Sequence, residues 1–97
     1  MEINNLTSNK GYKLKDLLLI KPKIYSDERG LFYESWNNEK YTKYLGNNHS
    51  IFQENVSHSK KGVIRGLHFQ IPPYSQGKLV KCTNGEIFDV AVDMRRN

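Results

Sequence analysis

The chain is 97 residues long, 37% hydrophobic and 26% charged, and its fifteen basic against ten acidic residues give a formal net charge of +5. This composition excludes a disordered chain and allows one domain with a modest core. The single cysteine, Cys82, excludes an intramolecular disulfide framework, and we expect it to be a small apolar strand residue. The basic residues are scattered, which favours a solvated surface over a nucleic-acid interface.

The N-terminal residues MEINNLTSNK hold no apolar targeting segment. The longest apolar run, LLLI at 17–20, is far shorter than a membrane-spanning helix requires. We therefore expect a cytoplasmic protein without a membrane partner.

The first elements in chain order are two strands. The runs at 17–25 and 31–36 are rich in strand-forming residues, and the sequence SDERG between them is typical of a turn. Pro22 within the first run indicates an edge position or a break, because proline cannot donate to a sheet ladder.

One short helix follows. Asn37 is a suitable N-cap, and Gly46 is a suitable residue to end the helix. The side chains of Tyr41, Tyr44 and Leu45 fall at helical spacing between these two residues.

The second half of the chain predicts four more strands, and Asn84 with Gly85 is a strong signal for a hairpin turn between the last two. In the final run, Phe88, Val90, Val92 and Met94 share one face and form a candidate core stripe. Short strands at close spacing predict an all-β sandwich or barrel. The four predicted strands are residues 50–57, 62–70, 77–83 and 86–94.

His68 is the strongest candidate for a functional side chain. The first role to consider for it is that of a metal ligand. A second histidine at position 70 would place two imidazoles on one strand face, but Gln70 stands there and is a poor ligand for transition metals. His49 and His58 offer no comparable spacing. We expect no protein-bound metal.

Proton transfer is the second reading of His68. Simple strand alternation places Arg65 and His68 on opposite faces, so only a bulge or twist at Gly66 would bring both into one pocket. The residues alone therefore leave a hydrogen-bonded structural histidine and a catalytic histidine open.

Four sequence elements, taken in order, resemble the dTDP-4-dehydrorhamnose 3,5-epimerase family. They are RGLFYE at 29–34, QEN at 53–55, RGLHFQ at 65–70, and QGKLVK at 76–81 followed by GEIFDVAVDMR at 85–95. The resemblance covers nearly all of the chain from about Lys21 onward. It implies a cupin-type jelly roll, a homodimer, no metal and no cofactor. It also implies that dTDP-4-dehydro-6-deoxyglucose, a dTDP-linked 4-keto-6-deoxy sugar, is converted to dTDP-4-dehydrorhamnose in deoxysugar biosynthesis.

The resemblance also implies roles for individual residues. His68 matches the general base that removes protons from C3 and C5, and Lys78 matches the lysine beside the developing enolate charge. The substrate-binding positions match Arg29, Glu34, Gln53, Asn55 and Arg65. No family role is implied for Asp89 and Asp93, and we expect them to be structural hydrogen-bond partners.

The family's reprotonating tyrosine and the aspartate that pairs with its base histidine have no match in this chain. We therefore expect residues 1–97 to be the N-terminal portion of a single cupin domain, a truncated jelly roll with one short helix. Two alternatives stay open. One is a non-catalytic sugar-nucleotide-binding fragment, and the other is a related keto-sugar isomerase or single-site epimerase.

Overall fold

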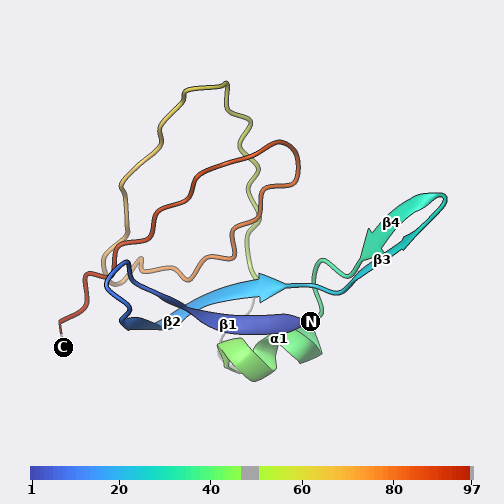
Figure 1. The fold of residues 1–97 in the computed structure, drawn as a ribbon. Coiled ribbons are helices and arrows are strands. Elements are labelled where there is room, and N and C mark those ends of the chain that lie inside the picture. Colours follow the sequence, from blue (N-terminus) through green and yellow to red (C-terminus); the bar gives the residue numbers. More distant parts are fainter. Residues whose placement is uncertain (47–50, 97) are drawn as a thin grey trace. The chain divides into compact units, whose positions relative to one another are not determined.

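A computed structural model describes residues 1–46 and 51–96 (Figure 1). The chain forms two units: Met1–Asn48 with Ala91–Asn97, and His49–Val90. The helix and strands of the described residues all lie in the first unit. They are two antiparallel two-stranded sheets and one short helix, which confirms the all-β prediction at the level of fold class.

The first sheet pairs β1 (Glu2–Thr7) with β2 (Lys13–Lys21). The register shifts along it, because Asn5 pairs with Leu18 whereas Thr7 pairs with Lys13. The additional residues of β2 form a bulge, in which Asp16 has the unusual φ of +67°. In this bulge the Lys15 carbonyl oxygen and the Asp16 carboxylate accept hydrogen bonds from Arg95.

The second sheet is a hairpin of β3 (Ile24–Asp27) and β4 (Gly30–Tyr33), joined by a two-residue turn (Figure 1). The break predicted at Pro22 is confirmed, since β2 ends one residue before it and β3 begins two residues after it. The hairpin places Arg29 at its tip, in the turn.

Helix α1 (Asn38–Leu45) has the ends that the sequence predicts. The Asn37 side chain accepts a hydrogen bond from the Lys40 backbone N–H at 3.1 Å, as an N-cap does. Gly46 ends the helix with φ of +87°, and its N–H donates to the Thr42 carbonyl oxygen at 2.8 Å.

Tyr41 is the one buried hydrophobic side chain among the described residues, with 4% of its surface exposed. Its ring lies 4.5 Å from the Trp36 ring, centroid to centroid, in a tilted arrangement. This aromatic contact fixes α1 against the segment that leads into it.

The four strands predicted after residue 49 are not formed: residues 51–96 contain turns and bends but no strand. Asn84 and Gly85 form a bend without a hairpin ladder, and the expected core residue Phe88 is 94% exposed. Cys82 is exposed as well, so its predicted place in a strand is also wrong here. Strand-forming residues need a neighbouring strand to pair their N–H and C=O groups, and this segment has none among the described residues.

Candidate functional site

Arg29 is held at the tip of the β3–β4 hairpin by Asp27. The Asp27 carboxylate accepts the Arg29 backbone N–H at 2.9 Å and the side-chain Nη2 at 2.6 Å. The side-chain Nε of Arg29 also donates to both carboxylate oxygens of Asp27, at 3.3 Å to Oδ1 and 3.2 Å to Oδ2. These bonds lower the pKa of Asp27 and raise the pKa of Arg29. The Arg29 side chain stays 89% exposed, so it is oriented but accessible.

Glu34 follows β4 directly and is anchored by two groups at the start of α1. Asn37 Nδ2 donates to Glu34 Oε2 at 3.2 Å, and Lys40 Nζ lies 3.2 Å from Glu34 Oε1. The hydrogen bond from Asn37, and after it the contact with Lys40, lowers the pKa of Glu34. Glu34 is therefore an ionised acceptor in a fixed position.

A pocket of about 540 Å³ lies beside Glu34. Tyr25 and Phe32, which pair across the hairpin, contribute aromatic rings to its lining. Lys23 Nζ lies 5.1 Å from the centroid of the Tyr25 ring. Rings and ammonium groups together suit an anionic ligand that carries a flat ring. The other lining residues are Met1, Pro22 and Lys40.

The second unit brings two of the predicted binding residues together. Gln53 Nε2 donates to Asn55 Oδ1 at 3.4 Å, and both side chains are exposed. Their remaining amide donors and acceptors face solvent and are available to a polar ligand.

His68 lies against Gly66. A Cβ built on Gly66 would be 3.1 Å from His68 Nδ1, and Gly66 has φ of +110°, which residues with a side chain rarely adopt. The backbone therefore departs from simple strand alternation at Gly66, the residue where a bulge or twist would be needed to bring Arg65 and His68 into one pocket. Arg65 Nε donates to Ser59 Oγ at 2.9 Å. Within residues 51–90, His68, Arg65 and Lys78 are not joined to one another by hydrogen bonds.

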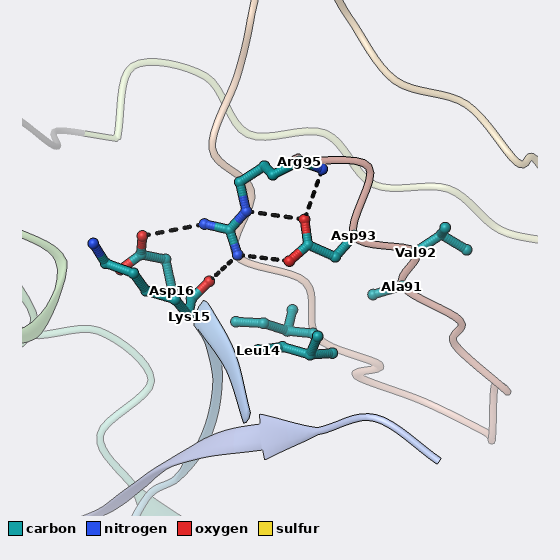
Figure 2. A pocket seen from close by; sticks show the side chains of 8 residues that line it. Leu14, Lys15, Asp16, Ala91, Val92, Asp93 and Arg95 are labelled. Carbon is teal, nitrogen blue, oxygen red and sulfur yellow. Dashed lines mark hydrogen bonds and ion pairs between the residues drawn. The ribbon is translucent and has the colours of Figure 1, made fainter. Parts of the chain in front are cut away.

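A second aspartate–arginine pair, Asp93 and Arg95, lies in the C-terminal segment of the first unit and contacts β2 (Figure 2). Asp93 accepts the Arg95 backbone N–H at 3.0 Å, Nε at 2.9 Å and Nη2 at 2.8 Å. This confirms the structural hydrogen-bonding role expected for Asp93, and it lowers the pKa of Asp93 to about 2. Arg95 also donates to the Lys15 carbonyl oxygen and, at 3.5 Å, to Asp16 Oδ2 in the β2 bulge. These bonds border a small pocket whose apolar lining is Leu14, Leu17, Ala91 and Val92.

No group of three or more potential metal-ligating side chains occurs in the described part of the chain. His49 lies outside the described residues. Among the helices of the same described ranges, none is long and apolar enough to cross a membrane.

Comparison with known proteins identifies the family. A family model described as dTDP-4-dehydrorhamnose 3,5-epimerase matches residues 11–97. The chain belongs to the dTDP-4-dehydrorhamnose 3,5-epimerase family. No solved structure matches it.

Curated relatives named dTDP-4-dehydrorhamnose 3,5-epimerase agree with this assignment. The Shigella flexneri protein is 49% identical over 85 residues, which are 88% of this chain and 47% of that protein. The Escherichia coli K12 protein is also 49% identical, over 88% of this chain and 46% of its own length. The Methanothermobacter thermautotrophicus protein is 49% identical over 87% of this chain and 44% of its own length. The chain thus spans about half the length of the curated relatives that it matches.

The sequence reasoning missed the contacts that three residues make around the candidate site of this epimerase-family chain, although it identified Asn37 as the helix N-cap. Asp27 orients Arg29, and Asn37 and Lys40 anchor Glu34. The spacing of these residues in the sequence could have indicated the contacts. Asp27 stands two residues before Arg29, where an aspartate bonds a turn backbone, and residues 34, 37 and 40 recur at intervals of three.

Proposed function

We propose that the protein is a 3,5-epimerase that acts on a dTDP-linked 4-keto-6-deoxy sugar. The observation that carries the proposal is the family match over residues 11–97, supported by relatives at 49% identity. The product would be dTDP-4-dehydrorhamnose, the sugar after which the family is named.

The proposed chemistry is proton transfer at the two carbons C3 and C5. A proton beside a ketone can be removed when a base of suitable pKa is present and the enolate oxygen is stabilised. We assign the base to His68 and the stabilising cation to Lys78. This chemistry requires no cofactor, and the proposal includes none.

The remaining proposed site residues bind the substrate. Arg65 and Arg29 supply guanidinium groups suited to phosphate or keto-sugar oxygens. Gln53 and Asn55, which lie within hydrogen-bonding distance of each other, offer amide groups to the nucleotide sugar. Glu34, held ionised by its neighbours, offers an acceptor for sugar or base N–H and O–H groups.

The proposal includes the architecture and setting that the family resemblance implies. These are a cupin-type jelly roll, a homodimer and action in the cytoplasm. A single cysteine without a disulfide partner is compatible with a reducing compartment.

The test is solvent-proton exchange in D₂O with the dTDP-linked 4-keto-6-deoxy sugar, followed by NMR. Deuterium uptake at both C3 and C5 supports the 3,5-epimerase. Uptake at one carbon alone would instead indicate a single-site epimerase. Binding of the substrate without uptake at either carbon would identify a non-catalytic sugar-nucleotide-binding protein.

A further inference from the structure

The chain contains the same local arrangement twice. In each copy an aspartate carboxylate accepts the backbone N–H of the arginine two residues later, at 2.9 Å for Asp27 and 3.0 Å for Asp93. In each copy the same carboxylate also binds the Nε–Nη2 edge of that arginine, with Nη2 at 2.6 Å and 2.8 Å respectively. A carboxylate two residues before an arginine can thus bind both its backbone N–H and its guanidinium. We call this arrangement an aspartate–arginine fork.

The two forks differ at the outer edge of the guanidinium, which is formed by Nη1 and Nη2. In Arg95 this edge donates to Asp16 Oδ2 and the Lys15 carbonyl oxygen (Figure 2). In Arg29 no acceptor among the described residues meets the outer edge, and the side chain is 89% exposed against 53% for Arg95. The Arg95 fork therefore shows what such an edge binds, namely oxygen acceptors.

We propose that Asp27 is a positioning residue that holds the Arg29 guanidinium with its outer edge open for an anionic oxygen pair of the nucleotide sugar. This inference rests on the proposed function, in which Arg29 binds substrate. An arginine side chain has many rotamers, and fixing one on binding costs affinity. Asp27 fixes it beforehand, because the hairpin turn and the carboxylate hold the backbone and the guanidinium together.

The charge of Asp27 acts in the opposite direction, since a carboxylate repels an anionic ligand. That repulsion is weak here because the Asp27 side chain is 52% exposed and screened by water and salt. We therefore expect the ordering effect to dominate. Asp27→Ala should weaken dTDP binding about 2- to 10-fold, which corresponds to the cost of ordering one long side chain. The phosphate oxygens of the nucleotide keep their charge between ground state and transition state, so weakening a contact to them should raise KM by a similar factor and leave kcat unchanged.

The experiment measures the Kd for dTDP by titration calorimetry on four proteins: the unmodified chain, Asp27→Ala, Arg29→Ala and the double variant. If Asp27 acts through Arg29, the double variant binds no more weakly than Arg29→Ala alone. If the two losses add fully, Asp27 has a separate structural role and the inference is overturned. Unchanged or tighter binding by Asp27→Ala also overturns it, as does a lack of dTDP binding by the unmodified protein.

Two further variants separate the guanidinium contact from the turn. Asp27→Asn keeps an oxygen for the Arg29 backbone N–H but loses the ion pair, so its dTDP affinity should match that of Asp27→Ala. Wild-type affinity in Asp27→Asn would overturn the inference. Asp93→Asn makes the same change in the Arg95 fork and should leave the Kd for dTDP unchanged; an equal loss there would mean a general effect on folding.

The inference and the proposed function fail in different ways. Deuterium uptake by the unmodified protein with additive effects of Asp27 and Arg29 would remove the inference alone. Coupled effects on dTDP binding without deuterium uptake would remove the epimerase proposal and leave the positioning role of Asp27 in place.

Discussion

The side chain of Asn37 links Glu34 to the first turn of α1. Its Oδ1 accepts the Lys40 backbone N–H at 3.1 Å, while its Nδ2 donates to Glu34 Oε2 at 3.2 Å. One amide therefore begins the helix and orients the candidate binding carboxylate. An amide suits this pair of contacts because it carries an acceptor and a donor on the same carbon.

Asn37→Asp should separate the two functions of this side chain. Aspartate is an equally good N-cap, so the helix should keep its stability. The donor to Glu34 is lost and a second negative charge replaces it, so the pKa of Glu34 should rise from its lowered value toward or above the ordinary 4.5. NMR titration of the Glu34 carboxyl carbon measures the change. An unaltered Glu34 titration would contradict the arrangement, and Lys40→Gln should give the smaller rise of the two variants.

Local features of the sequence predicted local structure well. The ends of α1 depend on Asn37 and Gly46, which act on the turns next to them, and the break at Pro22 follows from its missing N–H. Strand β1 was not predicted, since EINNLT is polar and rich in asparagine. It forms because it pairs with β2, and such pairing overrides weak strand propensity.

Features that depend on distant pairing were predicted poorly. The stripe that includes Phe88 has the alternation of a core strand, yet alternation alone supplies no partner strand for it. The candidate site was missed for a different reason, because its contacts are local. Motifs identified Arg29 and Glu34, but the neighbouring Asp27 and Lys40 contact them only through the geometry of the hairpin turn and the helix start.

Arg95→Gln should raise the pKa of Asp93. The side-chain and backbone hydrogen bonds from Arg95 hold the pKa of Asp93 at about 2, below its ordinary 3.8. Without the guanidinium, we expect the Asp93 pKa to return most of the way to 3.8, as read from the pH dependence of its carboxyl carbon shift. Arg29→Gln is the matched control, and it should move the titration of Asp27 and leave that of Asp93 in place.

The same pair predicts how stability depends on pH. The folded-state pKa of Asp93 is lower than the unfolded-state value, so its stabilising contribution is complete above about 3.8 and is lost as pH falls toward about 2. Asp93→Asn should therefore remove that part of the acid dependence, measured by urea unfolding across this pH range. An identical acid profile in the variant would show that other carboxylates account for the loss.

Gly66→Ala should displace the His68 imidazole. The new Cβ would lie 3.1 Å from Nδ1, tighter than an ordinary contact, and a φ of +110° is strained for alanine. Misplacing a catalytic group by about 1 Å can cost 10²-fold in rate, so we expect a loss in kcat of that order with dTDP binding retained. The measurement is initial-rate deuterium exchange beside calorimetric titration with dTDP.

Gly62→Ala is the control for backbone strain. Gly62 has a similarly positive φ of +86°, but a Cβ there meets no atom within 4 Å. The Gly62→Ala variant should therefore be less stable than the unmodified protein but should keep its kcat, unlike Gly66→Ala. Equal kinetic defects in the two variants would mean that strain, rather than contact with His68, explains the Gly66 result.

His68→Asn should separate chemistry from binding. Asparagine keeps hydrogen-bonding capacity at the position but cannot accept a carbon-bound proton near neutral pH, so both C3 and C5 should stop exchanging deuterium. Loss of a general base typically costs about 10² to 10⁴-fold in rate. The Kd for dTDP should stay unchanged, because the proposed nucleotide contacts are made by other residues. His58→Asn changes another exposed histidine of the same unit and should leave both quantities unchanged. Continued exchange at one carbon in His68→Asn would show that a second base serves that carbon, since a single imidazole responsible for both protons must lose both together.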